Sequence, residues 1–288
     1  MGGQKTYIQN FNDYINWIIS KNKLNEEVWF RGQRDDSWDL TPKLYRNAVM
    51  DTNMYSNVIS RLKYKISDFS KEFEEFKQSI QKIKGVDENL NDMQYLFLAQ
   101  HHGLQTPLLD WTTDPLVALY FALDDYNDDD DIYPCIYAIQ PGFINRNSLV
   151  VYKGENGQKN ITTAVCVDDD ILNEHSMEKI ISNESPFNFF PLAIYSNADF
   201  SHRISRQSGK FTIHGQITRL PSNPWHTTLI EGKTFAERIV INKNAIPELR
   251  EMLNIFNVNK DSIYRKVESE LDSICLELDK KYQDLSRK

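Results

Sequence analysis

One segment, residues 100–123, constrains the fold more than any other part of the chain. Its last eight residues, 116–123, are apolar on every side, so a helix formed there has no face for solvent and must be buried. Thr113 or Asp114 is suited to cap such a helix, and Pro115 is suited to its first turn, where a missing N–H costs nothing. The sequence therefore predicts a helix that starts here and runs inside the protein.

Apolar residues at helical spacing predict several further helices. Residues 54–83 carry one apolar stripe at intervals of three and four, which predicts a long helix ended by Gly85. A second helix is expected over residues 91–102, with Gly103 as its left-handed stop. Other helices are expected over residues 11–20, 170–181, 247–256 and 263–282.

Short apolar runs between these helices predict strands. They cover residues 28–30, 135–139, 211–214 and 238–241. No internal repeat and no low-complexity linker divides the chain. The pattern therefore predicts one α+β domain over residues 1–288.

Composition excludes several classes of protein. The chain is 40% hydrophobic, which supplies a sizeable core, and its formal net charge of −8 argues against a general binder of phosphate backbones. Its three cysteines have no disulfide or metal-site spacing, so we expect a reducing compartment and no metal. The longest apolar run is far shorter than the roughly 20 residues of a membrane span. Because the N-terminus also lacks the apolar core of a secretory signal, we expect a cytoplasmic protein without a membrane segment.

Arg31 is the first candidate site residue. It follows the apolar run 28–30, so its guanidinium is expected to leave a strand end into a partly enclosed space. A planar, permanently charged fork there suits a carboxylate or a diphosphate. A structural salt bridge to an acid such as Asp110 fits the residues equally well. Gly32 beside it permits close approach of another backbone.

The second candidate group is Asp110, Trp111 and Thr112, directly before the buried helix. A carboxylate beside hydroxyl groups and a helix N-terminus is well placed to bind a polar ligand against apolar walls. The alternative is a local cap network, which accounts for Thr113 and Asp114 but less well for Asp110 and Trp111.

Adjacent histidines, His101 and His102, stand at the end of a predicted helix, where the helix dipole favours a protonated imidazole. One is expected to face inward and the other outward. We expect His102 to face a ligand, together with residues 110–112 and opposite Arg31.

Together these segments resemble the FRG domain family, named for the Phe-Arg-Gly found here at residues 30–32. The resemblance covers residues 24–242 and leaves 243–288 as a C-terminal helical addition. Its further motifs are Trp-Asp-Leu-Thr-Pro at 38–42, Gln-His-x-Gly-Leu-x-Thr-x-Leu-Leu-Asp-Trp-Thr at 100–112, and Arg-x-x-x-Gln-x-Gly-x-Phe-Thr-x-His-Gly at 203–215. This chain has His102 where the family often has Tyr and Pro107 where it often has Arg, so position 107 offers no anion-binding side chain. Relatives in bacterial defence and toxin settings imply such a role here.

A more distant resemblance is to ADP-ribosyltransferases. In those enzymes a first strand ends in Arg, His or Tyr, a Ser/Thr-rich strand leads into an apolar helix, and a later strand bears Glu or a substitute. Residues 30–32 resemble the first element, residues 111–113 with the helix after them resemble the second, and Gln207 or Glu237 holds the third. The resemblance implies a mixed sheet with several packed helices, including a long helix after the first strand and helices at the C-terminus.

This second resemblance implies that the protein binds NAD and either transfers ADP-ribose to a macromolecule or cleaves NAD, without a metal. Arg31, with Gly32 and Gln33 beside it, is then expected to hold the diphosphate. Thr112 and Trp111 are expected to shape the pocket of the nicotinamide ribose.

The catalytic position of the third element stays open in the sequence. A Glu there bonds the ribose hydroxyl and stabilises the oxocarbenium charge, whereas a Gln does only the first, so Gln207 and Glu237 predict different activities. Two other functions also stay open. One is a non-catalytic sensor that binds a nucleotide or a protein, and the other is a metal-independent nuclease with His101 or His102 as acid and base.

Overall fold

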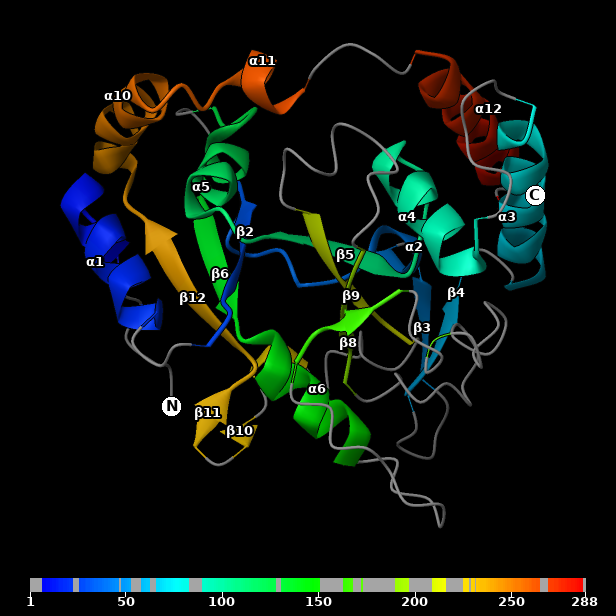
Figure 1. Cartoon of the computed structure of the whole chain (residues 1–288), viewed down its shortest axis with the longest axis horizontal. Helices are drawn as coiled ribbons and strands as arrows, with labels where there is room; N and C mark the ends of the chain where they lie inside the picture. The colour runs from blue at the N-terminus through cyan, green and yellow to red at the C-terminus, as the bar shows by residue number, and fades with distance from the viewer. Residues whose placement is uncertain are drawn as a thin grey trace.

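The centre of the protein is a mixed eight-stranded sheet with the strand order β1-β12-β6-β2-β5-β9-β8-β7 (Figure 1). The computed structural model describes residues 7–22, 26–46, 48–52, 58–62, 66–82, 90–127, 131–150, 163–167, 172, 190–196, 209–215, 225–227, 229–230, 232–264 and 269–286. The outer pairs β1–β12 and β7–β8 are parallel, and the pairs between them are antiparallel. The predicted α+β class with a mixed sheet and packed helices is confirmed.

The strands of the large sheet are β1 (Tyr7–Ile8), β2 (Trp29–Gln33), β5 (Leu108–Thr112), β6 (Cys135–Ile139), β7 (Val165–Cys166), β8 (Leu192–Tyr195), β9 (Gly209–Ile213) and β12 (Ala236–Ile241). Two small antiparallel sheets pair β3 (Ala48–Thr52) with β4 (Val58–Leu62) and β10 (Leu229–Ile230) with β11 (Lys233–Thr234). The helices are α1 (Phe11–Lys21), α2 (Lys43–Arg46), α3 (Ile66–Ile80), α4 (Asp92–His101), α5 (Pro115–Leu123), α6 (Pro141–Val150), α10 (Ile246–Ile255), α11 (Lys260–Ile263) and α12 (Ser269–Ser286), with short 3₁₀ turns at Trp225–Thr227 and Lys243–Ala245.

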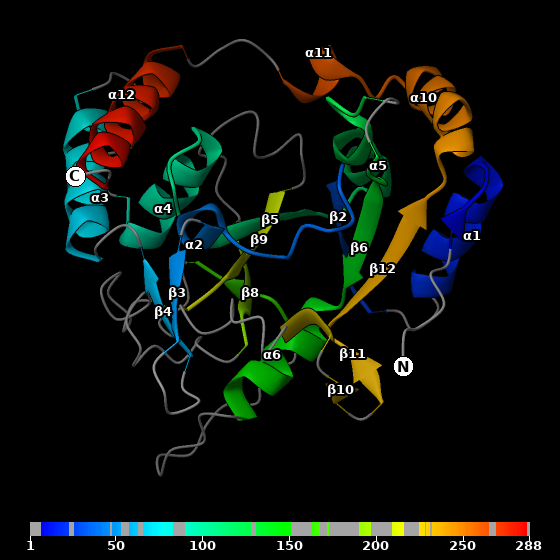
Figure 2. The same ribbon diagram turned by 180° about the vertical axis from the view of Figure 1, so that it is seen from behind.

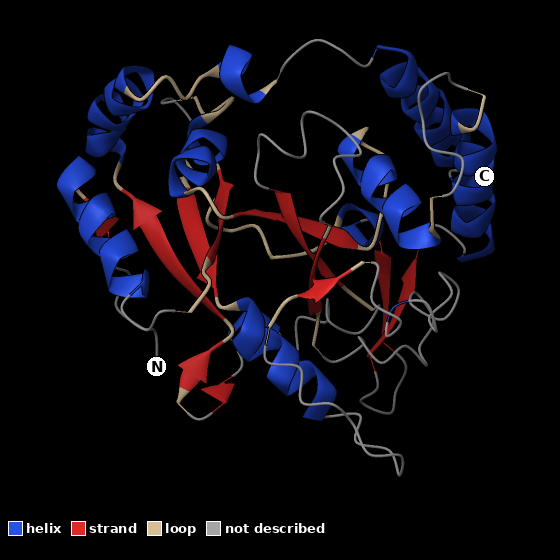
Figure 3. Cartoon of the chain, in the orientation of Figure 1, coloured by secondary structure: helices blue, strands red, loops and turns tan. Residues whose placement is uncertain are grey.

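The helices gather in two groups at opposite ends of the sheet (Figures 1 and 3). Helices α1, α5 and α10 share one apolar cluster with β2, β6 and β12, whereas α3, α4 and α12 share another with β8 and β9. A third cluster joins α6 to the opposite face of β2 and β6. The rear view shows the same two groups of helices (Figure 2). Among the described helices, none combines the length and the apolar character that crossing a bilayer requires.

Strands β2 and β5 share only a short contact. Strand β2 pairs with β6 along its whole length, from Trp29 opposite Ile139 to Gln33 opposite Cys135. With β5 its only registered pair is Phe30 opposite Thr112. Beyond that pair β5 leaves β2 at a wide angle (Figure 1). The sheet is therefore open between Arg31 and Asp110.

Gly32 lets α5 lie directly on β2. A Cβ atom built on Gly32 would stand 1.9 Å from the Ala118 carbonyl oxygen and 2.6 Å from the Ala122 amide nitrogen. Both contacts are backbone atoms, which cannot move aside as a flexible side chain can. The expected close approach of a backbone at this glycine is present.

Caps and stops of the helices agree with the local sequence. Asn10 caps α1, and Asp114 caps α5 by accepting hydrogen bonds from the amides of Leu116 and Val117. Gly103 follows α4 with φ +86°. The expectation of a buried helix over residues 116–123 is confirmed, since α5 buries five of its residues.

Two predicted helices are wrong at their boundaries. Residues 58–62 form strand β4 rather than helix, because Val58 and Leu62 fit the alternation of a strand as well as a helical stripe, and pairing with β3 decides between them. The long helix thus begins at Ile66. The predicted helix 263–282 is divided, since α11 ends at Ile263 and α12 begins at Ser269. The predicted helix over 170–181 lies outside the described residues, except for Leu172.

Candidate functional site

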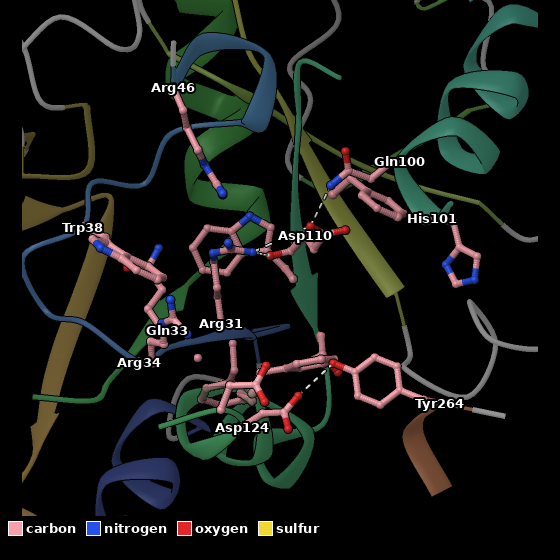
Figure 4. A pocket seen from close by; sticks show the side chains of 18 residues that line it. Arg31, Gln33, Arg34, Trp38, Arg46, Gln100, His101, Asp110, Asp124 and Tyr264 are labelled. Atoms are coloured by element: carbon pink, nitrogen blue, oxygen red, sulfur yellow. Dashed lines mark hydrogen bonds and ion pairs between the residues drawn. The ribbon is translucent and has the colours of Figure 1, made fainter. Parts of the chain in front are cut away.

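A cleft of about 440 Å³ lies where β2 and β5 separate (Figure 4). One wall is formed by residues 30–34 and the other by residues 110–112. The remaining walls come from α2, the end of α4, α5 and Tyr264. Its volume is within the range of about 300–1,000 Å³ that small-molecule sites occupy.

Arg31 lies in the middle of this cleft with little exposure to solvent. Only 15% of its side chain is exposed, and its Nη1 donates to the Asp110 carbonyl oxygen at 2.9 Å. Its Nε is buried without a hydrogen-bond partner among the described residues. Burial lowers the pKa of Arg31 to about 10, although Asp110 raises it and the charge of Arg46 lowers it again. The guanidinium is therefore charged at neutral pH but poorly compensated.

Asp110 forms a long salt bridge with Arg31, which was one of the two alternatives for this arginine, but the acid is not buried. Its side chain is 56% exposed, and its Oδ2 lies 3.8 Å from Arg31 Nη1. The nearer partner is Gln100, whose Nε2 donates to Asp110 Oδ2 at 2.7 Å. Thr106 in turn donates to Gln100 Oε1. This chain of bonds orients the carboxylate at the rim of the cleft.

Trp111 is fixed from behind the cleft by a buried polar network. Its Nε1 donates to the Thr212 hydroxyl at 2.9 Å, and the same hydroxyl lies 2.8 Å from His214 Nε2. Burial lowers the pKa of His214 to about 3, with smaller contributions from the charges of Arg31 and His226, so His214 stays neutral. The network gives Trp111 one orientation.

Thr112 takes part in the local turn as well as in the cleft. Its hydroxyl accepts a hydrogen bond from the Asp114 amide at 3.0 Å, directly before α5. The cap network weighed as an alternative is therefore present. Thr112 and Trp111 nevertheless both line the cleft, as do Gly32 and Gln33.

One segment of the chain is similar to a known protein domain. Residues 26–131 match the FRG domain. The matched segment runs from just before β2 to beyond α5, so it contains Arg31, Gly32 and Asp110. The motif at residues 203–215 falls outside it. No curated protein and no solved structure matches the chain.

His102 of the FRG segment does not line the cleft. Its side chain is 1% exposed, and its Nδ1 lies 2.8 Å from Asp272 Oδ1 on α12. The residue that lines the cleft is its neighbour His101. Because α4 ends at His101, the two imidazoles leave the chain in different directions, with ring planes at 90°.

Glu237, on β12, is separated from Arg31 by strand β6. Arg31, Tyr137 and Arg238 stand in one row across three strands. As the neighbour of Arg238 in its strand, Glu237 points to the opposite face of the sheet. It pairs with Lys21 and lines a different cleft. The other candidate, Gln207, lies outside the described residues.

The cleft is also lined by residues that the sequence did not point to as site residues, among them Arg34, Trp38, Arg46 and Asp124. Trp38 lies in a recognised motif, but nothing in that motif shows that the Arg34 guanidinium lies over its ring. The Asp124 carboxylate accepts hydrogen bonds from the hydroxyls of Tyr120 at 3.1 Å and Tyr264 at 3.0 Å. In the described part of the chain, no three His, Cys, Asp or Glu side chains are grouped as a metal site would require.

Proposed function

We propose that the cleft binds NAD and that the protein transfers ADP-ribose to a macromolecule or cleaves NAD, as an effector of bacterial defence or a toxin. The observation that carries the proposal is the nearly buried Arg31, whose Nε has no hydrogen-bond partner among the described residues. A buried charged donor with an unused N–H is costly unless an anion completes its shell. The diphosphate of NAD is such an anion.

The order of elements around the cleft supports the same proposal. Strand β2 carries Arg31, and β5 brings Trp111 and Thr112 to the cleft before the chain enters the buried helix α5. This order resembles that of ADP-ribosyltransferases. In the proposed complex Arg31 binds the diphosphate, while Trp111 and Thr112 shape the space of the nicotinamide ribose.

Cleavage of the glycosidic bond releases neutral nicotinamide and leaves an oxocarbenium ion on the ribose. Water or a nucleophile of the target then bonds to this carbon and loses a proton, which gives free ADP-ribose or the modified target. Positioning of the substrate and a nearby negative charge supply most of what the cleavage step requires. Glu237 lies in another cleft, so we do not give it this role. Asp110 is the carboxylate beside Arg31 and is the group that we propose to face the developing charge.

The test is an assay of nicotinamide release and of ADP-ribose transfer, with NAD labelled on either part. We expect activity in the wild type and a loss of about 100-fold or more in Arg31→Ala, because a charge-assisted bond to phosphate is removed in a buried place. Arg146→Ala is the matched control, since Arg146 is exposed on α6. Glu237→Gln should also keep full activity. A wild type that neither binds nor cleaves NAD contradicts the proposal.

A second candidate function is a sensor that binds a nucleotide without cleaving it. The position of Glu237 outside the cleft favours it, because the usual third-strand carboxylate is then missing from the described part of the site. The same assay separates the two functions. Binding of NAD that depends on Arg31, without release of nicotinamide, identifies the sensor. A nuclease role would rest on His101, since His102 lies away from the cleft, and degradation of RNA lost in His101→Ala would reveal it.

A further inference from the structure

The cleft holds a second arginine that faces Arg31. Arg46 ends helix α2, and its guanidinium points toward that of Arg31 in the close view (Figure 4). Its Nε donates to the Thr41 carbonyl oxygen at 3.1 Å, which fixes the direction of the side chain. The two groups interact, since the charge of Arg46 contributes to the lowered pKa of Arg31.

These two guanidinium groups share one partly compensating carboxylate. Asp110 raises the pKa of both, but it is 56% exposed. Two positive charges held side by side in a cleft repel one another, and the repulsion is relieved when an anion lies between them. Two forked donors also match an anion with two charged groups better than they match one monoanion.

A flat, cationic platform stands at the next position along the wall. The Arg34 guanidinium lies over the Trp38 ring, with Cζ 5.1 Å from the ring centroid. Trp38 is 44% exposed even though it is a large aromatic residue. Both residues line the cleft together with Arg31 (Figure 4). Nucleobases stack on aromatic rings and on arginine planes of this kind.

We propose that Arg31 and Arg46 together clamp a diphosphate and that the Arg34–Trp38 platform stacks a nucleobase, so that the cleft selects nucleoside diphosphates and their derivatives. The inference deepens the proposed function, because NAD is a derivative of this class. It assigns roles to Arg34, Trp38 and Arg46, and it holds for a protein that only binds the nucleotide.

Titration calorimetry with ADP, AMP and pyrophosphate tests the clamp. We expect the wild type to bind ADP at least about tenfold more tightly than AMP, since AMP can engage only part of the clamp. Arg46→Gln should lower the affinity for ADP by about tenfold or more and the affinity for AMP by less than about threefold, so that the preference for ADP is lost. Arg46→Lys keeps the positive charge but not the forked donors, so its affinity for ADP should lie between those of the wild type and Arg46→Gln. Arg146→Gln is the control for the loss of an arginine elsewhere.

The platform predicts a different pattern with the same probes. Trp38→Leu should lower the affinities for ADP and AMP equally, by about tenfold, and leave the affinity for pyrophosphate unchanged, because only the base contacts the platform. Trp38→Phe should retain most of the affinity. Circular dichroism of each variant shows that a loss of binding is not a loss of folding.

The outcomes separate this inference from the proposed function. If NAD binding needs Arg31 but is indifferent to Arg46 and Trp38, the clamp and the platform are wrong while the proposed function stands. If ADP follows the expected pattern and NAD is bound but never cleaved, the inference stands and the transfer activity fails. If neither nucleotide binds, both are overturned.

Discussion

Arg31 Nη1 donates to the backbone carbonyl oxygen of Asp110 at 2.9 Å, across the gap between β2 and β5. The registered pairing of these strands is limited to Phe30 opposite Thr112, so this side-chain bond stands where a longer pairing would have a backbone hydrogen bond. It bridges the two strands at the opening while leaving Nε unused. The residue that joins the walls of the cleft is therefore also the one best placed to hold an anion inside it.

Removal of the Asp110 charge should strengthen the binding of an anion. In Asp110→Asn the negative charge 3.8 Å from Arg31 Nη1 is lost, and with it a repulsion of about 1 kcal/mol toward a bound phosphate group. We expect pyrophosphate to bind about fivefold more tightly at low salt, with a smaller gain at high salt because of screening. Calorimetry measures both. Asp92→Asn, on the exposed start of α4, is the control, and a weaker affinity in Asp110→Asn would argue against an anion at Arg31.

Gly32→Ala should lower the stability of the fold rather than remove a group that binds a ligand in the cleft. The added Cβ would lie 1.9 Å from the Ala118 carbonyl oxygen, so α5 must move away from β2. We expect a loss of about 3 kcal/mol or more in the free energy of unfolding, measured by urea denaturation. Gly232→Ala, with φ +75° but nothing within 4 Å, should cost only about 1 kcal/mol. Equal losses in the two variants would contradict the close packing of α5.

His214 should make the protein sensitive to mild acid. Its folded-state pKa of about 3 lies below its ordinary value of 6.5, so between these two pH values the unfolded chain binds a proton that the folded chain excludes. This contribution to stability is complete above pH 6.5 and is lost as the pH falls toward 3. From pH 7 to pH 5 the loss amounts to about 2 kcal/mol.

The measurement is the free energy of unfolding against pH in wild type and in His214→Gln. The variant should be less stable at pH 7, because the bridge through Thr212 to Trp111 is altered, yet its slope between pH 7 and pH 5 should be shallower. An unchanged slope would show that another group governs acid sensitivity.

Asp272→Ala tests whether His102 has a structural role. The change removes the carboxylate 2.8 Å from Nδ1 of a histidine that is 1% exposed, and a buried polar group that loses such a partner costs about 1–3 kcal/mol. We expect that loss of stability together with unchanged affinity for ADP, since α12 does not line the cleft. A large drop in ADP affinity at full stability would instead indicate that His102 contributes to ligand binding.

Local signals predicted the ends of the helices because they act within a few residues. Asn10 and Asp114 accept bonds from amides two or three positions later, and Gly103 adopts a positive φ after α4. Local signals did not predict strand β4, because residues 58–62 were expected to belong to a helix. The spacing of Val58 and Leu62 suits a helix and a strand alike, and only a partner strand separates the two.

The sequence placed Arg31 at the end of an apolar strand, but β2 continues beyond it to Gln33, because the strand stays paired with β6 as far as Cys135. The sequence by itself did determine that α5 is buried and that residues 110–112 come just before it in the chain. Each of these depends on neighbours in the chain. Tertiary structure alone decided that Arg46 and Trp38 join Arg31 at one cleft, and that His102 and Glu237 do not. The physical reason is direction. Strand alternation, the wide angle between β2 and β5 and the last turn of α4 decide which way a side chain points, and these become definite only when the sheet and its helices pack together.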